Sequence, residues 1–199
     1  MKILLPVLSY LLGAFPTGYL LVKWTSQKDI RRLGSGATGA TNVLRQRGWR
    51  AALPVVLIDL AKGALPALAG YWISGGDSGF AALCGSLAVL GHCYPVYIGF
   101  RGGKGVATAA GAMFALAPGP AALCLGVFLI IVAVTRYVSL GSISAAVLFP
   151  VFGFFLRLHR PLLFGSLLLV AVILVRHRSN IARLLSGKER KLGQKDVPS

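Results

Sequence analysis

The chain has 199 residues and carries 21 Lys and Arg residues against 5 Asp and Glu residues, which gives a formal net charge of +16. Hydrophobic residues make up 56% of the chain and charged residues only 13%, whereas a soluble domain carries about 25% charged residues. This composition excludes an ordinary soluble domain, and the length leaves no room for a second one, so we expect one membrane domain over residues 1–199.

Long apolar blocks, each about as long as a bilayer is thick when helical, predict an all-α polytopic membrane protein. Charges, glycines and prolines divide these blocks into seven predicted transmembrane helices. Several are short, which is compatible with tilted or half-inserted helices. The first is longer than the apolar part of a signal peptide and lacks a clean cleavage site, so we interpret it as an uncleaved span. The predicted helices cover residues 3–22, 51–73, 80–98, 106–117, 121–135, 140–156 and 161–175.

The basic residues are distributed unevenly between the two sides of such a protein. Seven spans place the segments 23–50, 99–105, 135–139 and 176–199 on one side, and nearly all Lys and Arg residues lie there. The positive-inside rule therefore predicts an external amino terminus and a cytosolic carboxyl terminus. Because the charges lie between apolar segments, we expect the lipid bilayer as their partner and no nucleic acid.

The loop after the first predicted helix concentrates small and polar residues between Lys28 and Arg45. Glycines let backbone N–H groups approach an anion, hydroxyl and amide groups add donors, and arginine adds charge. A simple solvated turn needs fewer such residues, so we interpret the loop as an anion site. Its candidate binding residues are Ser35, Gly36, Gly39, Thr41, Asn42 and Arg45.

The same loop also matches the spacing Gly34-x-Gly36-x-x-Gly39 of a dinucleotide-binding fingerprint. That fingerprint requires a preceding strand and a βαβ unit. Here a basic polar stretch precedes the glycines, and Asp59, which has the spacing of the ribose-binding acid, lies in an apolar helix. We therefore reject a dinucleotide site.

Asp59 and Lys62 lie inside the second predicted helix, three residues apart and hence on one helix face. Charges inside a membrane are costly and are usually paired or directed at a polar cavity. The pair has two interpretations, a structural ion pair or a direct role in substrate binding, and both stay open.

A second glycine-rich stretch runs from Gly91 to Thr108 and contains a Gly-Gly-Lys-Gly turn that begins the fourth predicted helix. It resembles a P-loop only superficially, because the spacing is one residue short and a glycine replaces the Ser or Thr that binds magnesium. A glycine turn at a helix start still offers N–H groups, a positive dipole end and an ammonium group to phosphate. The candidates are Gly102, Gly103, Lys104 and Gly105.

The third stretch, Arg176 to Glu189, follows the last predicted helix. His177 and Asn180 recur at the spacing of one helical turn. A basic helix that merely anchors to lipid headgroups explains the arginines but not this His-Asn pair. The residues alone leave the two interpretations open.

The residue types that the chain lacks restrict the chemistry further. No two acidic residues lie close enough to hold a magnesium ion on a pyrophosphate, and neither a Gly-x-Ser-x-Gly elbow nor a His-x4-Asp dyad is present. No cluster has metal-ligand spacing. We therefore expect an activity without metal or cofactor.

The three stretches resemble the PlsY family of bacterial membrane glycerol-3-phosphate acyltransferases, which use acyl-phosphate as the donor. Ser35 to Arg45 is similar to the family's Ser-Gly-Asn-x-Gly-Ala-Thr-Asn-x-x-Arg, except that Ala37 stands where Asn is usual. The other two motifs match over residues 91–108 and 176–189. The missing Asn amide puts one contact in doubt.

The resemblance implies seven helices in a bacterial plasma (inner) membrane, with a cytosolic active site. It implies transfer of a fatty acyl group to the 1-hydroxyl of glycerol 3-phosphate, which gives lysophosphatidic acid and phosphate. A soluble enzyme that produces acyl-phosphate would be a possible partner, and we expect a monomer. By motif position Lys104, His177 and Ser35 would be catalytic. Substrate contacts would come from Ser35, Thr41, Arg45, Lys104, His177 and Asn180, with His92 and Ser142 as secondary candidates.

Because an acyl-phosphate is a mixed anhydride, its transfer needs no covalent enzyme intermediate, and orientation and charge stabilisation suffice. The proton acceptor is open between the donor's own phosphate, which we favour, and His177. Two other classes of protein compete with an enzyme: an organophosphate transporter, which usually has a midplane site and internal repeats, and a lipid-binding scaffold. We find no repeat of the glycine motifs, and a scaffold would not need their hydroxyl and amide groups.

Overall fold

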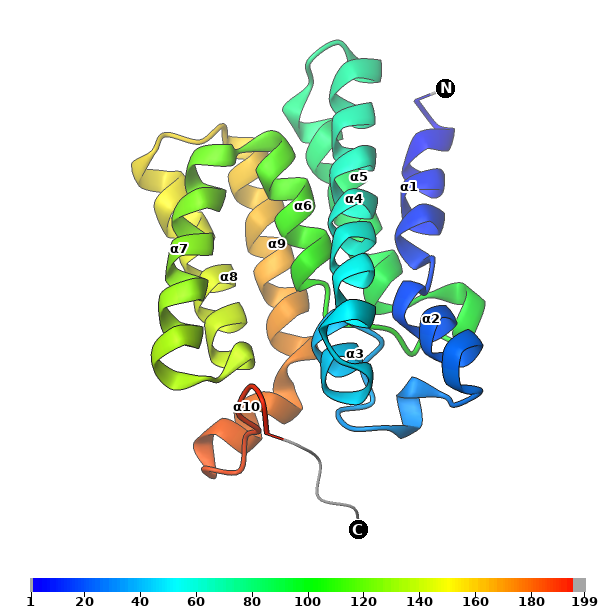
Figure 1. Cartoon of the computed structure of the whole chain (residues 1–199). Coiled ribbons are helices and arrows are strands. Elements are labelled where there is room, and N and C mark those ends of the chain that lie inside the picture. Colours follow the sequence, from blue (N-terminus) through cyan, green and yellow to red (C-terminus); the bar gives the residue numbers. More distant parts are fainter. Residues whose placement is uncertain (1, 195–199) are drawn as a thin grey trace.

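The computed structural model describes residues 2–194, and over these residues the fold is all-helical. Figure 1 shows α4 to α9 upright beside one another, with α1 against α5 at one edge and the short α2, α3 and α10 at the lower end. The amino-terminal end lies at the top, opposite α10. The elements are α1 (Leu4–Ala14), α2 (Thr17–Ser26), η1 (Ile30–Arg32), α3 (Ala40–Arg47), α4 (Trp49–Ser74), α5 (Ser78–Cys93), η2 (Val96–Ile98), α6 (Val106–Leu116), α7 (Pro118–Thr135), α8 (Val138–Phe155), α9 (Arg160–Arg176) and α10 (Arg178–Leu185).

Five helical segments among the described residues are long and apolar enough to cross a bilayer: Leu4–Ser26, Trp49–Ser74, Ser78–Ile98, Pro118–Thr135 and Val138–Phe155. A sixth results if α9 and α10, which meet at a bend of 62°, are counted as one broken span. The fourth predicted span corresponds to α6, which is apolar but has only 11 residues. The number of seven spans thus stays a prediction, while each predicted helix has a helical counterpart.

The first predicted helix is broken, which the sequence analysis did not anticipate. The break falls at Phe15 and Pro16, between α1 and α2. Proline has no N–H group and clashes with the carbonyl four residues earlier, so a helix cannot continue through it without local distortion. Lys62 of α4 donates a hydrogen bond to the Phe15 carbonyl oxygen at 2.9 Å, which satisfies an acceptor at the break.

The ion pair between Asp59 and Lys62 is present, with 2.9 Å between Lys62 Nζ and Asp59 Oδ1. Both side chains are buried. His92 of α5 faces the same carboxylate, with its Nδ1 3.7 Å from Asp59 Oδ1. Because Lys62 also donates to the Phe15 carbonyl oxygen, the pair links α4 to the α1–α2 break. Asp59 also lines the cavity described below, so a role in substrate binding stays open as well.

Glycines bring α4 and α6 into close contact. A Cβ atom on Gly63 would overlap the backbone of Thr108, and one on Gly111 would overlap the backbone of Leu60. Residues without a side chain allow such approach, and small residues are common at helix contacts inside membranes. Because α6 begins at Val106, directly after the turn 99–105, its contact with α4 also fixes where this turn lies.

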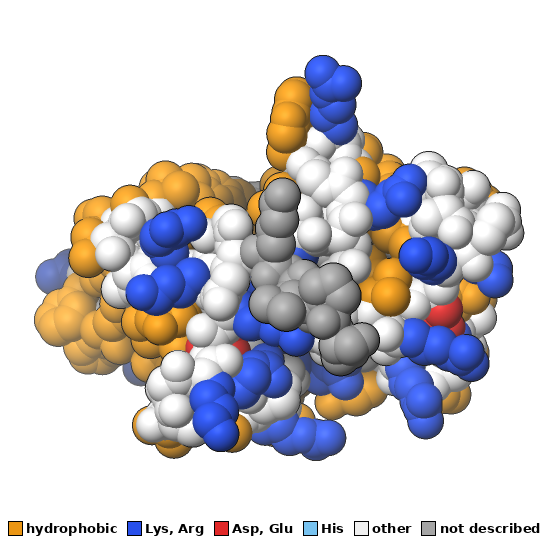
Figure 2. Space-filling view, turned by 60° about the horizontal axis from the view of Figure 1, so that its bottom comes forward, with side chains coloured by type: hydrophobic (Ala, Val, Ile, Leu, Met, Phe, Trp, Pro, Cys, Tyr) orange, Lys and Arg blue, Asp and Glu red, His pale blue; other side chains and the backbone are white. Residues whose placement is uncertain are grey.

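Lys and Arg side chains gather on the lower face of the molecule, as Figure 2 shows. The loops and short helices at this end carry most of the basic residues that the charge analysis assigned to one side. Residues 195–199, the end of the basic tail, and Met1 lie outside the described residues.

Candidate active site

A cavity of about 900 Å³ joins a polar end to an apolar part of the bundle. The apolar part is formed by α4, α6, α7, α8 and α9 and is lined by residues such as Leu68, Met113, Phe114, Phe128, Phe149 and Leu169. Most of the residues singled out from the sequence line this cavity, whereas Gly36, Gly102 and Gly103 belong to the same loops but do not line it. The predicted residues that line the cavity are Ser35, Gly39, Thr41, Asn42, Arg45, His92, Lys104, Gly105, Ser142, His177 and Asn180.

Asn42 organises the first loop. Its amide nitrogen donates to the carbonyl oxygens of Leu33 and Ala37 at 3.0 and 2.9 Å, and its Oδ1 accepts from the Ser35 N–H at 3.2 Å. The loop folds around this side chain, with Gly34 at φ +56° and Gly36 at φ +72°. Since both N–H donors of the Asn42 amide are used inside the loop, its role there is to position Ser35 rather than to offer donors to a ligand.

The Gly-Gly-Lys-Gly turn is held from two sides. The Gly103 N–H donates to the His92 carbonyl oxygen at 3.0 Å, and the His92 imidazole fills the space that a Cβ atom on Gly103 would need. Arg176, at the end of α9, donates to the carbonyl oxygens of Gly102 and Gly103, each at 3.0 Å. The Gly103 amide is therefore occupied within the chain.

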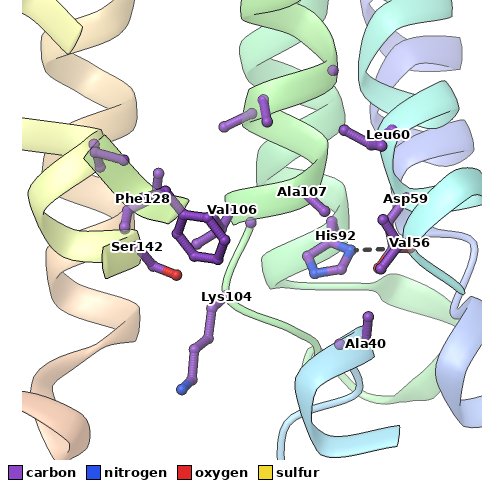
Figure 3. Close-up of a pocket in the computed structure, with 18 of the residues that line it drawn as sticks. Ala40, Val56, Asp59, Leu60, His92, Lys104, Val106, Ala107, Phe128 and Ser142 are labelled. Carbon is purple, nitrogen blue, oxygen red and sulfur yellow. Dashed lines mark ion pairs between the residues drawn. The ribbon is translucent and has the colours of Figure 1, made fainter. Parts of the chain in front are cut away.

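Lys104 extends from this turn into the polar end of the cavity, away from Val106 and Phe128 (Figure 3). Its Nζ donates to Asn180 Oδ1 at 2.6 Å. Burial lowers the pKa of Lys104 to about 8; Glu189 opposes this shift, and the cations of Arg183, Arg45 and Arg176 add to it. An anionic ligand would relieve this cost, because an opposite charge favours the protonated amine.

Glu189 is a buried carboxylate at the same end of the cavity, and the sequence analysis did not single it out as a site residue. Its Oε1 accepts from Ser139 Oγ and Asn180 Nδ2, both at 2.7 Å, and its Oε2 accepts from Arg183 Nε at 2.8 Å. Burial by itself raises the pKa of Glu189, but these hydrogen bonds outweigh it and hold the pKa below the usual value. The sequence offered one signal for this site residue, because an acidic residue is rare in a chain with 21 Lys and Arg against 5 Asp and Glu.

His177 lies at the junction of α9 and α10, buried from solvent. Its Nδ1 lies 2.8 Å from the Ile173 carbonyl oxygen. A carbonyl oxygen only accepts hydrogen bonds, so Nδ1 carries a hydrogen and Nε2 is the nitrogen left for a ligand. Ser142 lines the cavity from α8, and its hydroxyl donates to the Val138 carbonyl oxygen at 2.8 Å, which leaves its oxygen as an acceptor.

The arrangement combines three features in one cavity. Cations, hydroxyl groups and amide groups at the polar end suit a phosphate group and the hydroxyl groups next to it. A histidine nitrogen lies among them as a candidate acceptor or donor of a proton. The apolar part beyond suits a hydrocarbon chain, because a chain placed there is removed from water.

Known proteins resemble this chain over nearly its whole length. The family described as glycerol-3-phosphate acyltransferase matches residues 3–187. A glycerol-3-phosphate acyltransferase of Thermoanaerobacter pseudethanolicus is 43% identical over 195 residues, covering 97% of this chain and 96% of the relative. One of Prochlorococcus marinus is 44% identical over 198 residues, covering 98% and 99% of the two chains.

Two solved structures are also similar. Both are crystal structures of PlsY, described as an integral membrane glycerol 3-phosphate acyltransferase. The glycerol 3-phosphate form has a TM-score of 0.93 at 42% identity and covers 96% of each chain. The lysophosphatidic acid form has a TM-score of 0.89 at 41% identity and covers 96% of this chain and 95% of that one. The chain thus belongs to the glycerol-3-phosphate acyltransferase family, as an integral membrane protein of the PlsY type.

Proposed function

We propose that the protein transfers a fatty acyl group from acyl-phosphate to the 1-hydroxyl of glycerol 3-phosphate, which produces lysophosphatidic acid and inorganic phosphate. The observation that carries this proposal is the cavity that joins a cationic, hydrogen-bonding end to an apolar part. Both substrates carry a phosphate group, and one also carries an acyl chain. The similar PlsY structures in glycerol 3-phosphate and lysophosphatidic acid forms support the same substrate and product.

The polar end holds the phosphate groups and the glycerol. Arg45 and Lys104 neutralise phosphate charge, and Ser35 and Thr41 add hydroxyl donors. The glycines Gly36, Gly39, Gly102, Gly103 and Gly105 let the backbone come close to the anions. His177, Asn180 and Ser142 also line the cavity and bind the glycerol hydroxyl groups, and His92 supports the glycine turn.

The reaction needs no covalent intermediate on the enzyme. The 1-hydroxyl oxygen attacks the acyl carbonyl carbon, a new ester C–O bond forms, and the C–O bond between the acyl group and phosphate breaks. The hydroxyl proton passes to an oxygen of the donor's phosphate, which leaves as inorganic phosphate. Lys104 and nearby N–H groups stabilise the negative charge that develops on the carbonyl oxygen and on the leaving phosphate.

His177 is the alternative proton acceptor, through Nε2. Substitution His177→Ala distinguishes the two mechanisms. If His177 positions glycerol 3-phosphate, the substitution raises KM and lowers kcat, and if it is the general base, kcat falls while KM stays unchanged. We favour the first result because the donor's phosphate is itself a base within the reacting pair.

The loops and short helices that contribute polar residues to the cavity lie at the lower end of the molecule, where Lys and Arg side chains gather (Figures 1 and 2). The positive-inside rule assigns that face to the cytosol, which gives an external amino terminus and a cytosolic carboxyl terminus. Ends on opposite sides require an odd number of crossings, so we propose that α6 is a short seventh span and that residues 1–199 form one domain in a bacterial plasma membrane. The cytosol is also where a soluble enzyme would deliver acyl-phosphate.

The test uses purified protein in lipidic mesophase or detergent with glycerol 3-phosphate, and follows lysophosphatidic acid and released phosphate. Acyl-phosphate, acyl-CoA and acyl-carrier-protein donors are run in parallel, with Lys104→Ala as the control. Product from acyl-phosphate alone, lost in Lys104→Ala, supports the donor and the site together. Absence of product with every donor, while glycerol 3-phosphate still binds, refutes the enzymatic proposal and favours transport, which uptake into liposomes then measures.

A further inference from the structure

Arg176 contacts no part of the cavity, yet it is bound to the turn that carries Lys104. Its Nε and Nη2 donate to the carbonyl oxygens of Gly103 and Gly102, two consecutive peptide groups, at 3.0 Å each. Its guanidinium also lies over the ring of Tyr94, 5.1 Å from the centroid. The planar fork of arginine fits two neighbouring acceptors in a way that the single ammonium of lysine does not.

The two peptide groups are held differently. A peptide group is planar and trans, so its C=O and its N–H point in opposite directions. In the group between Gly102 and Gly103, the oxygen accepts from Arg176 and the N–H donates to the His92 carbonyl oxygen. Both ends of this group are therefore used within the protein.

In the group between Gly103 and Lys104, only the oxygen is held. Arg176 fixes the Gly103 carbonyl oxygen, and the Lys104 N–H points the opposite way. Among residues 2–194 this N–H has no acceptor within the chain, and Lys104 is half-buried. Lys104 and Gly105 line the cavity and Arg176 does not, so the direction away from Arg176 leads toward the cavity.

We propose that Arg176 is a positioning residue that aims the Lys104 backbone N–H at the phosphate group of a bound substrate. This inference rests on the proposed function. The residue touches neither substrate, and it acts by holding the Gly103 carbonyl oxygen. The Lys104 side chain and backbone then present an ammonium group and an N–H to one anion, a pairing typical of phosphate sites.

Through this hydrogen bond the end of α9 holds a turn that lies 73 residues away in sequence. His177 and Asn180 follow Arg176 directly, so one short segment carries two cavity residues and also fixes the turn opposite them. Lys104 Nζ donates to Asn180 Oδ1 at 2.6 Å, so the turn and this segment are also joined by a hydrogen bond between side chains.

The experiment compares Arg176→Lys and Arg176→Ala with wild type in the acyl-phosphate assay. KM for glycerol 3-phosphate is measured at saturating acyl-phosphate, and KM for acyl-phosphate at saturating glycerol 3-phosphate. We expect one of the two KM values to rise about tenfold or more in both variants, with kcat changed less, because a hydrogen bond to a charged group contributes about that much to affinity. The substrate whose KM rises is the one whose phosphate meets the Lys104 N–H.

Arg101→Ala is the matched control, because it removes a positive charge from the same turn without a contact to a carbonyl oxygen. Its KM values should stay within about twofold of wild type. Methylguanidinium added to Arg176→Ala should lower the raised KM, because it restores the fork, and methylammonium, which restores only charge, should not. A merely structural role of Arg176 would not give this difference.

Binding of inorganic phosphate, measured by calorimetry, separates this inference from the proposed function. If the wild type makes no lysophosphatidic acid, the proposed function fails, and weaker phosphate binding in Arg176→Lys still supports the inference. If both KM values and phosphate affinity in Arg176→Lys lie within about twofold of wild type, the inference is overturned. Equal rescue by methylammonium and methylguanidinium would overturn it as well.

Discussion

Deprotonation of Lys104 should lower the reaction rate as the pH rises, and it should do so at a pH well below the pKa of an ordinary lysine. Burial in the cavity lowers its pKa to about 8, from the usual lysine value of 10.5. The group is a base, so it carries its charge below that pKa and loses it above. The phosphate dianions that we propose as ligands need the cation, so kcat/KM for glycerol 3-phosphate should be high at pH 7 and decline above pH 8.

The size of the decline follows from one titration. One pH unit below the pKa about nine tenths of the Lys104 side chains are protonated, and one unit above it about one tenth are. Between pH 7 and pH 9, kcat/KM should therefore fall roughly tenfold if only the protonated form is active. The second ionisation of a phosphate group lies near pH 6, so the substrate contributes little to this alkaline limb.

The measurement is kcat/KM between pH 6 and pH 10, because this parameter reports the pKa values of the free enzyme. Two variants test the assignment. Lys104→Arg carries a guanidinium that stays charged throughout, so its alkaline decline should disappear, whatever its absolute activity. Glu189→Gln removes the one anion that raises the Lys104 pKa, so its decline should begin below pH 8. A profile that stays flat to pH 10 in wild type, or an identical midpoint in Lys104→Arg, would refute the assignment.

Two further predictions concern stability, measured as thermal unfolding in detergent. Lys62→Met leaves Asp59 buried without its partner and should lower the free energy of unfolding by about 3–5 kcal/mol. The double variant with Asp59→Leu should recover most of this loss. A single variant as stable as wild type would contradict the pairing. Gly111→Ala places a Cβ atom against the Leu60 backbone and should cost about 1–3 kcal/mol. Gly126→Ala, with no atom within 4 Å, should change stability by less than about 0.5 kcal/mol, and equal effects of the two substitutions would argue against close contact of α4 and α6.

The sequence could predict the helices and the meeting of the three polar stretches, because both follow from patterns along the chain. Apolar blocks of bilayer length predict helices, and the basic loops at one end bring the first loop, the turn before α6 and the segment after α9 to the same side. The spacing of His177 and Asn180 likewise placed both on one helix face toward the cavity.

The contacts that hold the site could not be predicted in this way. The break at Phe15 and Pro16 was not predicted, and the Lys62 side chain that bonds the Phe15 carbonyl oxygen there lies 47 positions from Phe15 in sequence. Asn42 was expected to offer donors to a ligand, and its donors instead hold the first loop, because the carbonyl oxygens of that loop turn inward. The partners in these contacts are backbone carbonyl oxygens, which every residue carries, so the residue types along the chain do not reveal them.

Glu189 shows how the site keeps its cations together in the absence of substrate. Burial is the main cause of the lowered pKa of Lys104, and the nearby cations of Arg183 and Arg45 add to the cost of its charge. Glu189 offsets part of that cost from within the chain: it accepts from Arg183 directly and orients Asn180, which in turn accepts from Lys104. The carboxylate accepts from three donors of the chain, and its single negative charge does not balance the cations around it. It leaves a net positive site, and that excess of positive charge is what an incoming phosphate group meets.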